Sequence, residues 1–214
     1  MHENLYFKIP DIKLPDEFFS NTEVIGDPAS SQILDFMNTS EQGQRTRLLQ
    51  TSDKESDWVT GTIDEYVAKQ LVEWCNDMFT IRFTNAYIIK TDPGKNGDWH
   101  CEGPLLQNRL CALNFLIQGD LGTTKAEWGI HKNYDVDPDF IDRYISKGVK
   151  HEDVDVVKEY ISEDNIPFFY NTACLHRSVN ENCTSPRTVL SVSAPFNIGM
   201  KEVTKMYENG TLLR

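Results

Sequence analysis

Two stretches of the sequence combine a histidine with a nearby acidic side chain. One is His100-Cys101-Glu102, which follows the turn-like text DPGKNGD, and the other is His151-Glu152-Asp153. Either pair could supply part of a metal site, and a thiol beside a histidine also suggests nucleophilic chemistry. The chain has five histidines and 33 acidic residues, so chance alone supplies about one such pair. The predicted secondary structure around each pair has to distinguish them.

The two pairs differ in where their side chains would point. On a strand, alternation places His100 and Glu102 on one face and Cys101 on the other, which suits chelation and separates the thiol from its base. Asp153 is expected to cap or open a helix, where residues two apart point about 200° apart. The sequence therefore favours His100 and Glu102 as metal ligands. A hydrogen-bonded core histidine beside a rim glutamate fits the same spacing.

Two residues further along the chain add to the first pair. His176 lies in the apolar segment NTACLHRSV, where a buried imidazole needs a bonding partner. Arg187 begins the apolar segment RTVLSVSAPF, and an arginine that points into a barrel needs an anion such as a bound carboxylate. An arginine at the start of a strand can instead extend to water. Two imidazoles and one carboxylate form the facial triad that suits non-haem Fe(II) with open coordination positions.

The elements that would carry these residues are mostly short strands. Residues 62–79 predict a helix, with Thr62 and Glu65 as a capping box and apolar residues at helical spacing. Residues 131–165 predict a helical insertion, with Asp137 as an N-cap before Pro138 and a helical repeat of apolar residues over 152–164. Strand-like text occupies 80–91, 99–103, 109–120, 123–130, 166–179 and 187–196.

This pattern predicts a mainly β fold with flanking helices, either a sandwich or a barrel. A parallel sheet would need helices between most of its strands, and the sequence does not supply them. The length of 214 residues predicts a single domain over 1–214, with a core barrel at about 80–196 and the helical insertion at about 131–165.

Composition narrows the class of partner. A net charge of −12 argues against nucleic acid or an anionic membrane surface as a partner, while a small anionic ligand needs only one or two arginines. The five cysteines are scattered without a CxxC pair and are odd in number, which argues against a disulfide framework. No signal peptide or membrane-spanning apolar run is evident. We expect a soluble cytoplasmic protein.

The order of these segments resembles the Fe(II)/2-oxoglutarate-dependent oxygenase superfamily. The stretches YIIKTDPGKNGDWHCEG, LNFLIQGDLGTT and CLHRSVNENCTSPR follow the family's order of a strand and turn, His-x-Asp/Glu, a strand before a Gly-Thr stretch, a distal histidine and an arginine. The resemblance covers residues 80–196 and extends to small phage-encoded members. It implies a double-stranded β-helix, the jelly-roll or cupin-like barrel of that family.

Carried over to this sequence, the resemblance implies that His100, Glu102 and His176 bind Fe(II). It implies that Arg187 binds the distal carboxylate of the cosubstrate 2-oxoglutarate. The sequence departs from the family in having Glu102 in place of the commoner aspartate. The presence of this carboxylate argues against a halogenase, which needs a non-ligating residue there.

A second departure concerns the cosubstrate carboxylate. Val189 stands where the family often has a serine, so another residue must supply the second contact to that carboxylate. The candidates are Ser191, Asn114 and Tyr87.

The resemblance implies hydroxylation of a small molecule or a protein side chain, coupled to conversion of 2-oxoglutarate to succinate and carbon dioxide. Two alternatives remain open. One is a non-catalytic barrel that serves as a binding or structural protein, and the other is a metal-dependent barrel enzyme that does not use 2-oxoglutarate.

Overall fold

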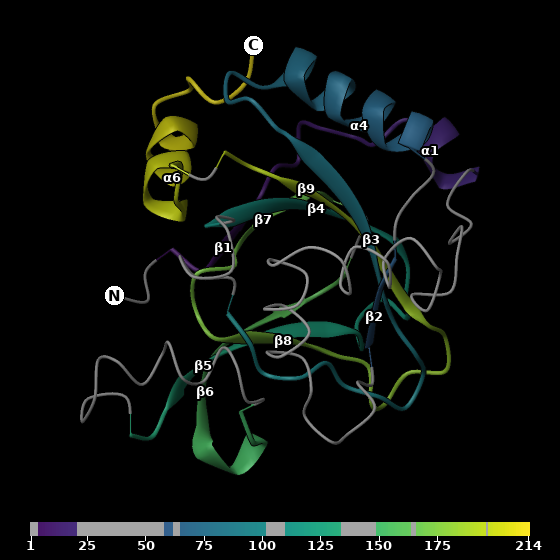
Figure 1. The fold of residues 1–214 in the computed structure, drawn as a ribbon, viewed down its shortest axis with the longest axis vertical. Helices are drawn as coiled ribbons and strands as arrows, with labels where there is room; N and C mark the ends of the chain where they lie inside the picture. The colour runs from purple at the N-terminus through teal and green to yellow at the C-terminus, as the bar shows by residue number, and fades with distance from the viewer. Residues whose placement is uncertain are drawn as a thin grey trace, which may run out of the picture.

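The structure, a computed structural model, describes residues 4–20, 58–61, 65–101, 110–133, 149–163, 166–195 and 197–214. Two antiparallel sheets and a few helices make up this part of the chain (Figure 1). The elements in chain order are β1 (Tyr6–Lys8), α1 (Glu17–Ser20), β2 (Trp58–Gly61), α4 (Glu65–Met78), β3 (Asn85–Thr91), β4 (Cys111–Gln118), β5 (Lys125–His131), the 3-10 turn η3 (His151–Asp153), β6 (Val154–Ile161), β7 (Phe168–Asn171), β8 (His176–Val179), β9 (Arg187–Ser193) and α6 (Met200–Glu208).

The larger sheet has the strand order β1-β7-β4-β9-β3-β2, and the smaller sheet has the order β6-β5-β8. Residues 96–100 extend the smaller sheet beyond β8, because Asn96 bridges Val179 and His100 bridges His176. All of these pairings are antiparallel. The turn that leads from β3 into residues 96–100 contains Gly94 at φ 74°, a left-handed conformation that glycine adopts without strain.

The path of the chain between the sheets identifies the fold. From β3 onward the chain alternates between them: β3 in the larger sheet, residues 96–100 in the smaller, β4 in the larger, β5 and β6 in the smaller, then β7, β8 and β9 in turn. The larger sheet therefore places β7, β4, β9 and β3 side by side, and the smaller places β6, β5, β8 and residues 96–100 side by side. Eight strand segments wound in this order form a double-stranded β-helix, or jelly roll.

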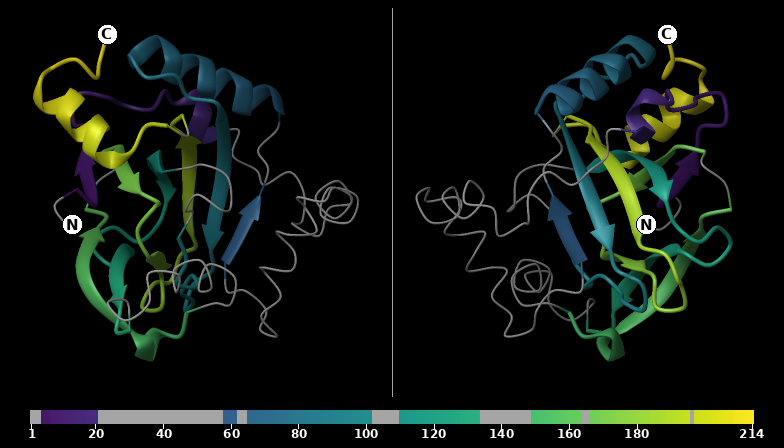
Figure 2. Two further views of the ribbon diagram at one scale, coloured as in Figure 1. Left: turned by 60° about the vertical axis from the view of Figure 1, so that its left-hand side comes forward. Right: turned by 90° about the vertical axis from the view of Figure 1, so that its right-hand side faces the viewer.

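Aromatic contacts between the two sheets define which side chains face inward. Tyr170 and Phe168 of β7 in the larger sheet pack against Trp128 of β5, Tyr160 of β6 and His176 of β8, with ring centroids 4.2–4.9 Å apart. Figures 1 and 2 show the two sheets facing each other across this contact. Because side chains alternate along a strand, these contacts fix the inner and outer face of every strand that pairs with β7.

The outer face of the larger sheet is covered by helices. Leu71 and Cys75 of α4 are fully buried in one cluster with Ile88, Leu113 and Leu190 of the sheet. The same cluster contains Ile9, Ile12, Leu14 and Phe18 of the N-terminal segment and Met200 and Val203 of α6. Figure 2 shows α4 and α6 against this sheet. The barrel is thus supported from outside by elements that lie before and after it in the sequence.

Most of the predicted strands are present, and α4 confirms the predicted helix over its described residues, Glu65–Met78. Thr62, the expected cap of that helix, and Asp137 with Pro138 lie outside the described residues. The segments β1, α1, β2 and α6 were not predicted from the sequence.

The predicted helical insertion is wrong where the structure describes its second half. Residues 154–161 form strand β6, which pairs with the full length of β5. The residues VDVVKEYI have apolar side chains at both helical and strand spacing, and β-branched and aromatic residues favour the strand once a partner edge is available. Tyr160 is buried on the inner face, and Val154 is buried beside Trp99 on the outer face, whereas Val157 and Ile161 are exposed. The change of face between Tyr160 and Val154 follows a bulge in the pairing with β5.

The predicted single strand over residues 166–179 is also wrong. It is two strands, β7 in the larger sheet and β8 in the smaller, separated by the crossing segment 172–175. The apolar text is continuous because both strands are buried, and periodicity does not reveal where the chain passes from one sheet to the other.

No helix in the described part of the chain is long and apolar enough to cross a lipid bilayer.

We predict that Leu71→Ala lowers the free energy of unfolding by about 2–5 kcal/mol, because Leu71 is fully buried between α4 and the larger sheet. Chemical denaturation followed by far-UV circular dichroism measures this loss. The matched control on the same helix is Lys69→Ala, which removes only an exposed contact to Glu73 and should change the free energy by less than about 1 kcal/mol. Equal effects of the two substitutions would contradict the placement of α4.

Candidate metal centre

His100 and His176 lie directly opposite each other on neighbouring strands. The amide of His100 donates to the carbonyl of His176 at 3.0 Å, and the amide of His176 donates to the carbonyl of His100 at 2.8 Å. Residues that exchange both backbone hydrogen bonds project their side chains to the same face of the sheet. Their ring centroids are accordingly 4.3 Å apart, with 56° between the ring planes.

The two imidazoles are oriented in the same way. Nδ1 of His100 lies 2.8 Å from the carbonyl oxygen of Asp98, and Nδ1 of His176 lies 2.7 Å from that of Cys174. A carbonyl oxygen only accepts, so each Nδ1 must carry the proton, and in the neutral ring Nε2 then has the lone pair. A histidine that binds a metal through one nitrogen commonly donates its other N–H to a backbone carbonyl. Both rings therefore have the tautomer of a metal ligand.

The inner face of the barrel accommodates this pair. His176 is buried, and its ring meets the edge of Tyr170 with the centroids 4.9 Å apart. His100 is half-buried. The third expected ligand, Glu102, lies outside the described residues. Within the described residues no group of three or more His, Cys, Asp or Glu side chains is arranged around a common point, so this part of the chain supplies two imidazoles.

Arg187 is a buried cation on the opposite sheet. It begins β9, pairs with Thr91 of β3, and shares the inner face with Thr91, whose hydroxyl lies 2.8 Å from that of Ser178 in β8. Among the described residues, Nε of Arg187 is buried without a hydrogen-bond partner, and no acidic side chain forms an ion pair with the guanidinium. Burial lowers the pKa of the Arg187 guanidinium, while the nearby phenols of Tyr170 and Tyr160 act in the opposite direction.

A buried arginine without a counterion is costly, because desolvation is not repaid by an opposite charge. Arginine nevertheless keeps its proton in proteins. A ligand carboxylate would supply both the charge and the hydrogen-bond acceptors that this site needs.

The three residues considered for a second carboxylate contact form one row across the larger sheet. Tyr87 of β3 pairs with Ser191 of β9, which pairs with Asn114 of β4. All three share the inner face with Arg187. The row lies four residues along β9 from Arg187, roughly 13 Å at the rise of an antiparallel strand. Oδ1 of Asn114 is buried, and no donor in the part of the chain that the structure describes bonds to it.

The connection from β8 to β9 holds Arg187 in place through residues that the sequence did not reveal. The fully buried Asn180 donates through its side chain to the carbonyls of Thr91, Asp92 and Ser185. Asp120, which follows β4, accepts from the backbone amide of Thr184 at 2.6 Å and from its hydroxyl at 3.0 Å. Asparagine and aspartate that bond to nearby backbone groups are typical of turns. Only the tertiary structure shows which distant segments Asn180 and Asp120 hold together.

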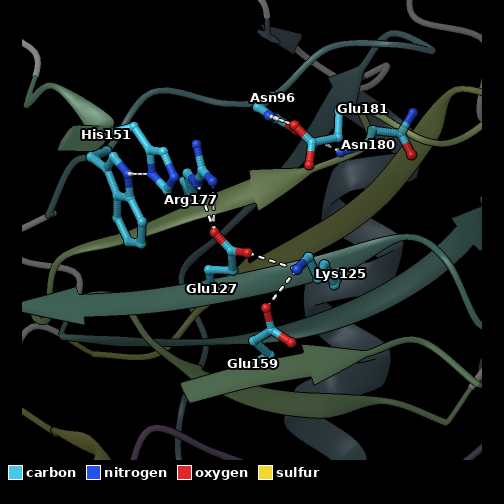
Figure 3. A network of polar contacts seen from close by, with 9 residues as sticks. Asn96, Lys125, Glu127, His151, Glu159, Arg177, Asn180 and Glu181 are labelled. Atoms are coloured by element: carbon cyan, nitrogen blue, oxygen red, sulfur yellow. Dashed lines mark hydrogen bonds and ion pairs between the residues drawn. The ribbon is translucent and has the colours of Figure 1, made fainter. Parts of the chain in front are cut away.

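A second set of functional candidates lies on the outer face of the smaller sheet. Arg177 follows His176 and forms a buried ion pair with Glu127 of β5, which Lys125 also contacts (Figure 3). Desolvation acts to raise the pKa of Glu127, but hydrogen bonds from Lys125 and Arg177 outweigh it and keep that pKa below its usual range. The reasoning that selected Arg187, a cation in apolar strand text, would also have selected Arg177.

The second histidine–acid pair has a different setting from the one expected. Residues His151–Asp153 form a 3-10 turn that leads into strand β6, so Asp153 does not open a helix. Nδ1 of His151 accepts a hydrogen bond from Nε1 of Trp99 at 3.3 Å, and the two rings are parallel to within 4°. His151 therefore lies on the outer face of the smaller sheet, away from His100 and His176.

The surroundings of the described cysteines indicate a role in packing. Cys101 and Cys111 are buried, and the Cys111 thiol donates to the carbonyl of Ile198 at 3.4 Å. Desolvation raises the pKa of Cys75 and of Cys174, so neither is a thiolate near neutral pH.

No protein-family model matches the sequence, and no curated protein matches it. Several solved structures are similar to this chain. The non-heme alpha-ketoglutarate-dependent carbocyclase SnoK from nogalamycin biosynthesis is 12% identical, with a TM-score of 0.46 over 90% of this chain and 80% of that one. A prolyl hydroxylase from Trichoplax adhaerens, in complex with a hypoxia inducible factor peptide fragment, is 11% identical, with a TM-score of 0.42 over 91% and 84%.

A third similar structure is the viral collagen prolyl hydroxylase vCPH from Paramecium Bursaria Chlorella virus-1, which is 12% identical with a TM-score of 0.40 over 90% of this chain and 96% of that one.

We predict that Asp120 makes stability depend on pH in the acid range. Hydrogen bonds from the Ser185 and Thr184 side chains and the Thr184 amide lower the pKa of Asp120 from 3.8 to about 2 in the folded protein. An acid whose pKa is lower in the folded than in the unfolded protein stabilises the fold at pH values above its unfolded pKa. This stabilisation is lost as the pH falls through the pKa of the folded protein. Wild type should exceed Asp120→Asn in free energy of unfolding at pH 6, and the difference should shrink between about pH 4 and about pH 2. Urea denaturation at several pH values measures this, and a difference independent of pH would contradict it.

Proposed function

We propose that this protein is a non-haem Fe(II)- and 2-oxoglutarate-dependent dioxygenase that hydroxylates a small molecule or a protein side chain. The observation that carries the proposal is the hydrogen-bonded pair of His100 and His176, whose imidazoles lie side by side on the inner face of a double-stranded β-helix. In the neutral ring with its proton on Nδ1, each presents Nε2 as the nitrogen with the lone pair. Two neutral imidazoles beside a carboxylate suit Fe(II) and leave coordination positions open.

The residues present fit such a metal. His100 and His176 would bind it through Nε2, while the carbonyls of Asp98 and Cys174 restrain the rings through Nδ1. Glu102, which lies outside the described residues, is the residue that the sequence suggests for the carboxylate ligand. Bound Fe(II) and 2-oxoglutarate supply the oxidising power for C–H hydroxylation.

Arg187 fits the cosubstrate. Its buried guanidinium has no anionic partner in the described chain, and it would bind the distal carboxylate through a charge-assisted contact. Asn114 would orient a polar group of the cosubstrate or a water through Oδ1, to which no described residue donates. Tyr87 and Ser191 adjoin Asn114 on the same face and are the further candidates for this contact.

Aromatic residues of the inner face would also exclude water from the proposed site. Trp128, Tyr160 and Phe168 are fully buried between the sheets on the inner face. In a water-poor surrounding of this kind, the attraction between a guanidinium and a carboxylate is much stronger than at the surface.

We predict that His100→Ala, His176→Ala and Glu102→Ala each lower the affinity for Fe(II) by more than about 100-fold. Losing a residue that only hydrogen-bonds to a metal ligand costs about 10- to 100-fold, and each of these substitutions removes a ligand itself. Anaerobic titration of the apo-protein with Fe(II) measures the affinity, and circular dichroism verifies the fold. His151→Ala is the control from the rival pair and should retain the metal. Loss of iron in His151→Ala alone would show that we chose the wrong pair, and no binding by wild type would favour the non-catalytic barrel.

We predict that Arg187→Met leaves Fe(II) binding intact and weakens 2-oxoglutarate binding about 10- to 100-fold, the magnitude of one or two charge-assisted hydrogen bonds. The readout is the weak visible charge-transfer band that 2-oxoglutarate adds to the anaerobic Fe(II) protein. Arg187→Lys keeps the positive charge but lacks the planar guanidinium. Its affinity for 2-oxoglutarate should lie between those of wild type and Arg187→Met.

Without ligand, Arg187→Met should be at least as stable as wild type, because it removes a buried charge with which no described acidic residue forms an ion pair.

If wild type binds Fe(II) but 2-oxoglutarate adds no charge-transfer band, a metalloenzyme that does not use 2-oxoglutarate would be favoured.

A further inference from the structure

The two histidines have sequence neighbours that face the other side of the smaller sheet. His100 opposes His176, so the adjacent residues Trp99 and Arg177 lie together on the outer face. The Arg177 guanidinium carbon lies 4.9 Å from the centroid of the Trp99 ring, within the range of a cation–π contact. The strands that carry the two imidazoles are therefore joined on their outer face as well as by backbone hydrogen bonds.

Arg177 also joins β8 to the next strand. Its Nε and one terminal nitrogen are each 2.8 Å from the same carboxylate oxygen of Glu127, the residue opposite it on β5. The two side chains are 10% and 5% exposed, so this ion pair is buried. Lys125 contacts the other oxygen of Glu127 at 2.8 Å and also Glu159 of β6 (Figure 3). Arg177 thus contacts the strand on each side of β8.

The packing around Trp99 leaves little room for adjustment. A Cβ placed on Gly129 of β5 would lie 3.1 Å from the Trp99 ring and 2.1 Å from the Val154 side chain, so the glycine is needed where Trp99 crosses β5. On its other side Trp99 stacks on His151. Trp99 is 2% exposed. A shift of Trp99 would consequently move the backbone of residues 99–100 rather than the side chain alone.

We propose that Arg177 is a positioning residue: by holding Trp99 and Glu127 on the outer face of the smaller sheet, it fixes the spacing and orientation of the His100 and His176 imidazoles on the inner face. This proposal rests on the proposed function for the claim that these imidazoles bind a metal. The arrangement of the imidazoles themselves does not depend on that claim.

The experiment compares Arg177→Met, Arg177→Lys and the double variant Glu127→Gln/Arg177→Met with wild type. Arg177→Met leaves Glu127 buried without its arginine, so it should lose stability. The double variant removes both members of the pair, and Lys125 keeps its contact with Glu159, so stability should return. The control is Lys132→Met, which removes a half-exposed lysine that contacts Asp155 and the Glu152 carbonyl but neither Arg177 nor Glu127, and it should leave the tautomers and the Fe(II) affinity as in wild type.

Two readouts separate positioning from a general structural role. In the apo-protein, ¹⁵N NMR of the imidazoles should show the Nδ1–H tautomer for His100 and His176 in wild type and mixed tautomers in Arg177→Met. Anaerobic Fe(II) titration should show affinity about tenfold or more below wild type, as for outer-shell residues. In the double variant both defects should persist although stability returns, and Arg177→Lys should recover part of the affinity.

The outcomes are distinct. Wild-type tautomers and wild-type affinity in Arg177→Met, or full recovery of both in the double variant, would overturn the positioning role. If wild type binds no Fe(II), the proposed function fails, and the tautomers in the apo-proteins still decide whether Arg177 positions the histidines.

Discussion

The pairing of residues 96–100 with β8 is the constraint on which the rest of the site depends. Two backbone hydrogen bonds join His100 to His176, and an antiparallel pair of this kind must project both side chains to one face. If the register of one strand slipped by one residue, every side chain of that strand would change face. Rotation of a side chain alone could not then bring the two rings together. The side-by-side arrangement of the two imidazoles, on which the proposed metal site rests, is therefore a consequence of strand register.

The rest of the fold secures that register. The jelly-roll path places β8 between β5 and residues 96–100, so both of its edges are paired. Asn180, in the turn that follows β8, donates to the carbonyls of Thr91 and Asp92 at the end of β3 and of Ser185 in the same turn, and Asp120 binds this turn from the end of β4. These bonds determine where β9 starts, and so where Arg187 enters the barrel. Helix α4 covers the far side of the larger sheet, which leaves its inner face to the site.

The two arginines near His176 illustrate how a buried charge can serve structure or binding. Arg177 is paired with Glu127 on the outer face, and its charge is compensated within the protein. Arg187 is equally buried on the inner face and has no acidic partner in the described chain. The first arrangement stabilises a fixed geometry, while the second is favourable only when an anion arrives. The contrast is our reason for assigning ligand binding to Arg187 and positioning to Arg177.

The sequence by itself determined the mainly β class, the helix α4 and the strands β3, β4, β5 and β9, because alternation and apolar spacing are local properties of the chain. It also singled out His100 and His176, whose imidazoles lie side by side in the structure. It did not determine β6, since VDVVKEYI fits a helix and a strand equally until β5 offers an edge. It did not separate β7 from β8, because burial on both sides hides the crossing between sheets. Arg177 bonds to Glu127 at a separation of 50 residues, Asn180 to the Thr91 carbonyl at 89 and Asp120 to the Thr184 amide at 64. Only the tertiary structure could decide these contacts, because hydrogen bonds and ion pairs across such separations depend on which strands become neighbours.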